Sequence, residues 1–160
     1  MTAQAGADAH DAPDVIAFPP FIFAGAMTIG LIAHWIHPVR PFPPIPSRVI
    51  GALLIVAGAA LAKWGKSRLQ NAGTNVDPRQ PSTAIVVDGP YRFTRNPLYL
   101  GTTIIYLGVT LLVNAVAPLV LLPVLLIVID RGVIAREESY LEGKFGEPYR
   151  AYCREVRRWF

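Results

Sequence analysis

The sequence is poor in the side chains from which soluble enzymes build acid–base and metal sites. It has one cysteine, Cys153, and three histidines, none of which lies beyond His37. A single cysteine excludes an internal disulfide and a cysteine metal cluster. The lack of histidine over the rest of the chain argues against acyl transfer and metal-assisted hydrolysis, so we predict no metal site. Internal repeats, a P-loop and a dinucleotide fingerprint are also absent from the sequence.

Charged residues are scarce as well, at 16% of the 160 residues, whereas 52% are hydrophobic. The hydrophobic residues gather in long blocks, which predicts an integral membrane protein. The formal net charge is +4, and the basic residues flank the apolar blocks. We therefore expect membrane lipids as partners and no nucleic acid. The length suits a single domain, residues 16–160, which follows a small and acidic segment, residues 1–15, that is typical of a disordered cytosolic tail.

The apolar blocks predict an all-α fold with about four transmembrane helices. The first two spans cover roughly residues 18–36 and 49–64, and a proline-rich, extended connector, residues 37–47, separates them. The small residues of the second span predict close packing of helix against helix. Residues 98–129 are too many for one span, so they predict a short helical hairpin that turns near Asn114.

The polar segments indicate how the chain is oriented. Residues 70–94 are rich in Gly, Asn, Asp and Pro, which predicts turns with a short extended piece at residues 85–87. The helical pattern continues past the fourth span through Leu141, and the basic, aromatic C-terminal residues are typical of an interfacial amphipathic helix. Of the fifteen basic residues, only Arg40 and Arg48 fall in the first connector. The positive-inside rule then places both termini and the polar loops in the cytoplasm, as in an inner-membrane protein.

Three polar features converge on this cytoplasmic side and predict a cofactor pocket. They are Ala72-Gly73-Thr74, the stretch Gly89–Gly101, and the pair Glu137-Glu138. The N–H groups of Gly73 and Thr74 are candidates to bind a carboxylate or hydroxyls. Such a pocket suits a small ligand that carries both charges, with the reactive group on a cofactor that the protein positions.

Two details of these features need a structure to decide them. Consecutive glutamates diverge by about 100° on a helix, so we expect one to face the pocket and the other to pair with Arg131 or Arg136. Within Gly89–Gly101, Pro97 can open a helix as its first residue. The alternative for this stretch is an ordinary interfacial anchor, an interpretation that we keep for Tyr91 and Phe93.

The order of these motifs resembles the integral-membrane methyltransferase superfamily. The resemblance rests on Gly89-Pro-Tyr-Arg-Phe-Thr-Arg-Asn-Pro-Leu-Tyr-Leu-Gly101, on Glu137-Glu138 and on Phe145-Gly-Glu-Pro-Tyr-Arg-Ala-Tyr152, and it covers about residues 70–160. That superfamily includes isoprenylcysteine carboxyl methyltransferases and phospholipid N-methyltransferases. It implies an enzyme that uses S-adenosyl-L-methionine to methylate a membrane-embedded or amphiphilic acceptor, which enters from the bilayer.

The resemblance also implies roles for individual residues. It implies catalytic roles for Arg95, Asn96 and Glu138, and cofactor contacts from Ala72, Gly73, Thr74, Gly89, Tyr91, Arg95, Pro97, Tyr99, Gly101, Glu137 and Glu138. Asn96 stands where the isoprenylcysteine branch has histidine, which resembles the Asn-Pro of the phospholipid branch. Asparagine does not titrate near neutral pH.

The sequence leaves the acceptor and two other classes of function open. The acceptor is either the carboxylate of a prenylcysteine-like compound or the amine of a phospholipid head group. An amine must first lose a proton, for which Glu137 and Glu138 are the nearby candidates. The alternatives to a methyltransferase are a nicotinamide-dependent membrane reductase of the sterol-reductase type and a non-catalytic membrane binding protein.

Overall fold

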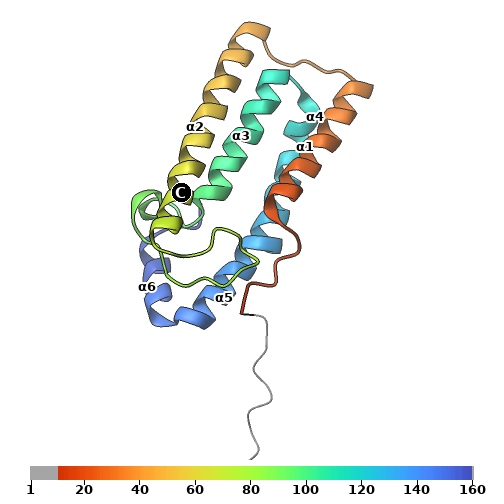
Figure 1. Cartoon of the computed structure of the whole chain (residues 1–160). Coiled ribbons are helices and arrows are strands. Elements are labelled where there is room, and N and C mark those ends of the chain that lie inside the picture. Colours follow the sequence, from red (N-terminus) through yellow and green to blue (C-terminus); the bar gives the residue numbers. More distant parts are fainter. Residues whose placement is uncertain (1–10, 160) are drawn as a thin grey trace, which may run out of the picture.

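The computed structural model describes residues 11–159, and within this range every regular element is helical (Figure 1). The prediction of an all-α fold is confirmed. In chain order the elements are α1 (Pro19–Ile36), α2 (Pro44–Asn71), the 3-10 helix η1 (Gly89–Arg92), α3 (Pro97–Val113), α4 (Val116–Ile129), the π-helical turn η2 (Asp130–Ile134), α5 (Ala135–Phe145) and α6 (Glu147–Glu155).

The helices have the lengths that a membrane protein needs. Three of them are long and apolar enough to cross a bilayer: α1, α2 and the continuous run from α4 through α5 (Val116–Phe145). The fourth, α3, is a shorter apolar helix of 17 residues, or about 25 Å at ~1.5 Å per residue. The predicted membrane fold of about four helices is therefore confirmed, including its short hairpin arm.

The hairpin between α3 and α4 turns at Asn114, as predicted. Asn114 has φ 57° and ψ 49°, a left-handed conformation that asparagine tolerates better than most residues. Its side chain also holds the first connector: the Phe42 N–H donates to Asn114 Oδ1 at 3.1 Å, and Asn114 Nδ2 donates to the Phe42 carbonyl at 2.8 Å. The Asn114 side chain therefore holds the hairpin turn to the first connector as both acceptor and donor.

The second helix is longer than the sequence predicted. It begins at Pro44, so the connector ends at residue 43 and not at residue 47. The reason is that a proline in the first turn of a helix gives up no hydrogen bond, because the N–H groups there have no intrahelical partner. The helix also continues beyond Trp64 to Asn71, which carries its polar end up to the predicted pocket.

Close packing of α2 on α3 depends on glycines, as their density predicted. A Cβ added at Gly58 would lie 2.5 Å from the Gly101 carbonyl oxygen, and one added at Gly51 would lie 2.6 Å from that of Gly108. Only glycine allows backbones to approach this closely. The helices α2 and α3 therefore form one tightly joined pair.

The other pair is α1 with α4. Gly30 of α1 packs on Pro118 of α4, and Phe23, Leu125 and Ile129 belong to a buried cluster that extends along η2. Contacts between the two pairs are few by comparison, so a seam runs between them along the bundle (Figure 1).

One end of the bundle, here called the loop end, carries the polar segments. The loop of residues 72–96, which includes η1, lies there beside α5 and α6 (Figure 1). Residues 85–87 form no strand, and Val86 packs with Tyr91, Tyr149 and Tyr152 in a second buried cluster. The interfacial interpretation is therefore wrong for these three tyrosines of η1 and α6, because their rings fill the protein interior. Phe93 is 72% exposed and fits an anchor.

The N-terminal segment runs alongside α5. The Asp11 carboxylate accepts hydrogen bonds from Tyr140 and Lys144, and the Ile16 N–H donates to the Gly132 carbonyl at 3.2 Å. Residues 11–15 thus have defined contacts, although they belong to the segment predicted as a disordered tail. The first ten residues of that predicted tail lie outside the described residues.

Candidate functional site

A cavity at the loop end gathers most of the predicted site residues. It lies between the start of α3, α5 and the 72–96 loop, and it encloses about 130 Å³. Eight predicted residues line it: Thr74, Tyr91, Arg95, Asn96, Pro97, Tyr99, Glu137 and Glu138. The start of α3 is fixed there as expected, because Pro97 is its first residue.

Four other predicted residues do not line the cavity, and each has a structural role nearby. Ala72 caps α2, and Gly73, at φ +70°, follows it in the left-handed conformation that ends many helices. Gly89, at φ +60°, turns the chain over the Arg68 side chain, and Gly101 packs on Gly58. These residues support the backbone segments that carry the cavity-lining residues.

The expected role of the loop N–H groups is wrong. The Gly73 N–H donates to the Gln70 carbonyl at 3.0 Å, and the Thr74 N–H donates to the Leu69 carbonyl at 3.1 Å. Both groups satisfy carbonyls at the end of α2, so neither is free for a ligand. The Thr74 hydroxyl instead accepts from the Thr83 N–H at 3.0 Å, which ties the two ends of the loop together.

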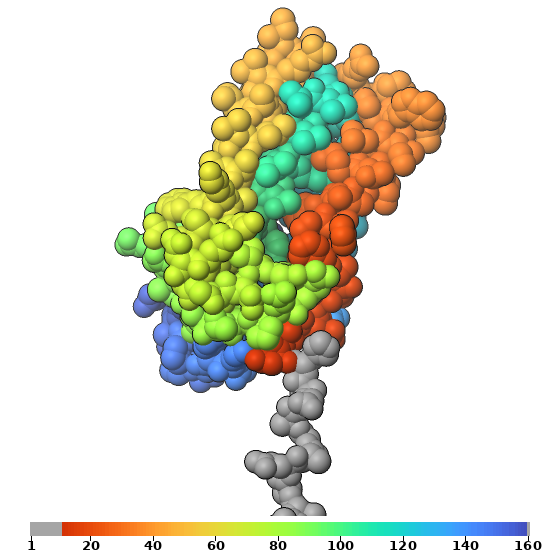
Figure 2. All heavy atoms as spheres, viewed as in Figure 1, coloured from red at the N-terminus to blue at the C-terminus, as the bar shows by residue number. Residues whose placement is uncertain are grey.

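The loop covers the cavity and attaches to two helices. The Ser82 N–H donates to the Tyr140 hydroxyl of α5 at 3.3 Å, and the Arg79 guanidinium lies 4.4 Å from the ring centroid of Phe18, just before α1. Asp77 pairs with Arg79 at 2.7 Å, and this hydrogen-bonded guanidinium lowers the pKa of Asp77. Figure 2 shows the loop meeting the N-terminal segment over this end of the bundle.

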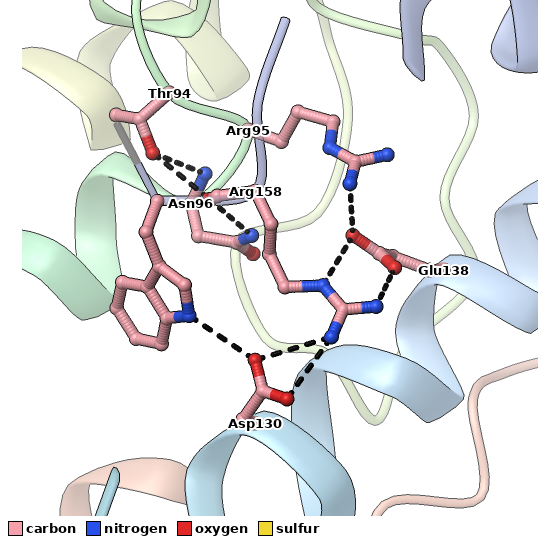
Figure 3. Close-up of polar contacts among 7 residues, drawn as sticks. Thr94, Arg95, Asn96, Asp130, Glu138 and Arg158 are labelled. Atoms are coloured by element: carbon pink, nitrogen blue, oxygen red, sulfur yellow. Dashed lines mark hydrogen bonds and ion pairs between the residues drawn. The ribbon is translucent and has the colours of Figure 1, made fainter. Parts of the chain in front are cut away.

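Glu138 is the centre of an ion network on one wall of the cavity (Figure 3). Its carboxylate lies 3.1 Å from Arg95 Nη2 and also accepts from Arg158 Nε and Nη2. Arg158 Nη1 in turn donates to Asp130 at 3.0 Å. The predicted pairing with Arg131 or Arg136 is therefore wrong. The partners come from segments distant in sequence.

Glu137 differs from Glu138 because it faces the cavity without a cation. Its carboxylate accepts a hydrogen bond of 3.0 Å from the Tyr99 hydroxyl, and it forms no ion pair with any residue in the range 11–159. The rings of Tyr91, Tyr149 and Tyr152 line the same cavity. Burial raises the pKa of these three phenols, so they stay neutral and protonated near a carboxylate.

Arg95 lines the same cavity and has one donor without a partner among the described residues. Its side chain is 14% exposed, and its Nε is buried without a hydrogen-bond partner in the described part of the chain. A buried donor of this kind costs free energy until something accepts its hydrogen bond. The cavity is therefore lined by a carboxyl group without an ion-pair partner in residues 11–159, Glu137, and by an arginine whose Nε has no hydrogen-bond partner there, Arg95.

Asn96 connects the site to the C-terminal residues. Its Nδ2 donates to the Arg158 carbonyl at 3.0 Å, and the Thr94 hydroxyl donates to the same oxygen at 3.1 Å. The Arg95 N–H donates to the Arg157 carbonyl at 3.0 Å. Residues 156–159, here called the C-terminal strap, are therefore held against residues 94–96. The Asn96 amide group has a structural partner, and its catalytic role stays a prediction.

Sequence reasoning missed several residues of this site. Arg158 is one of four arginines in the C-terminal tail, and nothing in the sequence separates it from Arg150, Arg154 or Arg157. Asp130 directly follows an apolar run of helix, and an acid in that position is costly unless it has a partner. That cost was the signal for a half-buried ion network at this end of α4.

Comparisons with known proteins identify the family of the chain. A sequence model of the family described as phospholipid methyltransferase matches residues 46–148, more than half of the chain. An uncharacterized protein of Haemophilus influenzae is 48% identical over 62 residues, which make up 39% of this chain and 78% of that protein. The family match begins earlier than the resemblance at residues 70–160 and includes α2, the loop, the ion network except Arg158, and α5. The chain therefore belongs to the phospholipid methyltransferase family of membrane methyltransferases.

Proposed function

We propose that this protein transfers a methyl group from S-adenosylmethionine to the amine of a phospholipid-like, amphiphilic acceptor. One observation carries the proposal: Glu137 places a carboxylate without a cationic partner in a cavity lined by tyrosines. A carboxylate in such surroundings favours a positively charged ligand. A carboxylate acceptor of the prenylcysteine type would be repelled by the same group.

The residues of the cavity fit the methyl donor in charge and shape. S-adenosylmethionine carries a sulfonium, an ammonium, a carboxylate and an adenosine group. Glu137 is placed to attract its cationic part, and the guanidinium of Arg95, which lines the same cavity, is the candidate to donate to its carboxylate. The tyrosine rings offer flat apolar surfaces and attract cations through their faces. When bound, this cofactor supplies an electrophilic methyl group.

The chain's own residues then have two tasks. Glu137 accepts the proton that an ammonium acceptor must lose before its nitrogen can act as a nucleophile, and the Tyr99 hydroxyl orients the carboxylate for this step. The first turn of α3, together with α5, holds the methyl donor and the acceptor in line with each other. Positioning of this kind is the main contribution that a protein makes to such a transfer.

The loop must move to admit a ligand as large as a nucleoside. The cavity encloses about 130 Å³, whereas small-molecule sites usually have ~300–1,000 Å³. The loop residues that cover it attach to the helices through a weak hydrogen bond at Tyr140 and a cation–π contact at Phe18. We propose that these contacts open and close during each catalytic cycle.

The placement of basic residues supports a cytoplasmic site. Lys63, Lys66 and Arg68 lie near the loop end of α2, whereas Arg40 and Arg48 lie at the opposite end of the bundle. The larger group of basic residues accompanies the loop end, so the positive-inside rule places the cavity and both termini in the cytoplasm of an inner-membrane protein.

Ligand binding to the purified protein in detergent tests the cofactor. At 100 times its Kd, S-adenosylhomocysteine should raise the melting temperature by about 5–10 °C, because stabilisation grows as RT ln(1 + [L]/Kd). Glu137→Gln should weaken binding about tenfold or more, and Glu142→Gln, which removes the same charge from an exposed position of α5, should leave it unchanged. A shift with NADPH alone would make the protein a reductase.

The acceptor is tested separately with a labelled methyl donor. Vesicles of phosphatidylethanolamine and a prenylcysteine analogue in matched detergent are offered as acceptors. We expect label in the phospholipid, and none in that product after Glu137→Gln. Label only in the prenylcysteine analogue would contradict the amine acceptor while leaving the cofactor assignment intact.

A further inference from the structure

We infer that Arg158 is a positioning residue of this site, and that it acts by keeping Arg95 free to bind a ligand. The inference rests on the proposed function. Arg158 lies in the C-terminal strap, beyond the residues that the family match covers, and it does not line the cavity.

The geometry around Arg158 fixes its guanidinium in one orientation (Figure 3). Nε and Nη2 both donate to Glu138, at 3.1 and 2.5 Å, while Nη1 donates to Asp130 at 3.0 Å. Trp159 Nε1 donates to the same aspartate at 3.1 Å. Two-pronged contacts of this kind are directional, and arginine is the one side chain that can make them on two sides at once.

The strap that carries Arg158 is held by the segment that carries Arg95. Thr94 and Asn96 side chains donate to the Arg158 carbonyl, and the Arg95 N–H donates to the Arg157 carbonyl. The two arginines therefore approach Glu138 from adjacent segments with their backbones tied together. Asn96, for which a catalytic role was predicted, makes one of the hydrogen bonds that join the two segments.

The two arginines compete for one carboxylate. Arg158 occupies both oxygens of Glu138, so Arg95 contacts it through Nη2 alone and keeps its Nε unpaired. Without Arg158, Arg95 would be free to form a two-pronged pair with Glu138 and turn its donors away from the cavity.

A double-mutant cycle tests this inference. The affinity for S-adenosylhomocysteine is measured by calorimetry in detergent for wild type, Arg158→Gln, Arg95→Gln and the double variant. Arg157→Gln is the control, since it removes the same charge from the adjacent, exposed residue of the strap. We expect Arg158→Gln to weaken binding at least tenfold and Arg157→Gln to change it less than twofold. In the Arg95→Gln background, Arg158→Gln should have no further effect, because its action requires Arg95.

Other outcomes separate the two proposals. If wild type binds the ligand but Arg158→Gln matches Arg157→Gln, or if the two losses multiply in the double variant, the inference about Arg158 is overturned. If wild type does not bind the ligand, the proposed function itself fails. Should Arg158→Gln not fold, Asp130→Asn provides the second test, because it loosens Arg158 while leaving Glu138 and Arg95 in place. It should weaken binding about threefold, and unchanged binding would again overturn the inference.

Discussion

Replacing Gly58 by alanine should destabilise the protein, although alanine is the better helix former. The added Cβ would lie 2.5 Å from the Gly101 carbonyl oxygen and 2.9 Å from Ile105 N. A carbon and an oxygen normally approach no closer than about 3.3 Å, so α2 and α3 would have to separate by several tenths of an ångström. Overpacking of this kind costs about 1–3 kcal/mol.

Gly25→Ala is the matched control. Gly25 lies in the middle of α1, and an added Cβ there meets no atom within 4 Å. The substitution should stabilise the helix by up to about 1 kcal/mol, the intrinsic difference between the two residues. The two variants should therefore differ by roughly 1–4 kcal/mol in unfolding free energy.

Thermal unfolding in detergent measures this difference. At about 2–4 °C per kcal/mol for a chain of this size, Gly58→Ala should melt roughly 2–16 °C below Gly25→Ala. Affinity for S-adenosylhomocysteine should fall in Gly58→Ala as well, since α2 ends at the loop and α3 begins with Pro97 in the cavity wall. Equal melting temperatures for the two variants would refute the close approach of the helices.

Three further predictions concern single contacts. Tyr99→Phe removes the hydroxyl that donates to the cavity carboxylate, and it should weaken S-adenosylhomocysteine binding three- to tenfold in calorimetry and lower the stability by about 1–3 kcal/mol, because the carboxylate loses its partner. Asn114→Ala removes two hydrogen bonds to the first connector and puts alanine at φ 57°; it should lower stability by about 1–3 kcal/mol in thermal unfolding, and no change would contradict the turn. Hydrogen bonds from Lys144 and then Tyr140 hold the pKa of Asp11 below its ordinary value, so the contact should persist at neutral pH and be lost only as the pH falls below about 4. The protection of residues 11–18 against hydrogen exchange, relative to the intrinsic exchange rate at each pH, should then fall, and Asp11→Asn should show the same loss of protection at neutral pH.

The fold was predictable where a feature depends on local chemistry. Asn114 marks the hairpin because the apolar run is too long for one span and asparagine tolerates a left-handed turn. Pro97 marks the start of α3 because proline needs no N–H there. The start of α2 was misplaced for the same physical reason, since prolines in a first turn and prolines in an extended connector look alike in sequence.

The sequence predicted most of the residues that line the cavity, but it did not predict which of them form ion pairs with one another. Glu137 and Glu138 were expected to take different roles because a helix turns them apart, and they do. Which cation joins Glu138 depends on how the strap returns to the start of α3, and residues 20 and 43 positions away meet only in the folded chain. Backbone N–H groups at Gly73 and Thr74 had been expected to bind a ligand. The hydrogen bonds that end α2 use them.

The seam between the α2–α3 pair and the α1–α4 pair has a mechanical consequence. At the loop end, the Tyr99–Glu137 hydrogen bond and the Arg95–Glu138 ion pair both join the start of α3 to α5, and so they cross from one pair to the other. Glycine packing joins α2 to α3, and the buried cluster of α1 and α4 also takes in Tyr106 of α3, whose hydroxyl donates to the Pro118 carbonyl at 2.9 Å. The cavity therefore lies where these two contacts join the start of α3 to α5, so a change in the spacing of the two helix pairs would change the width of the cavity.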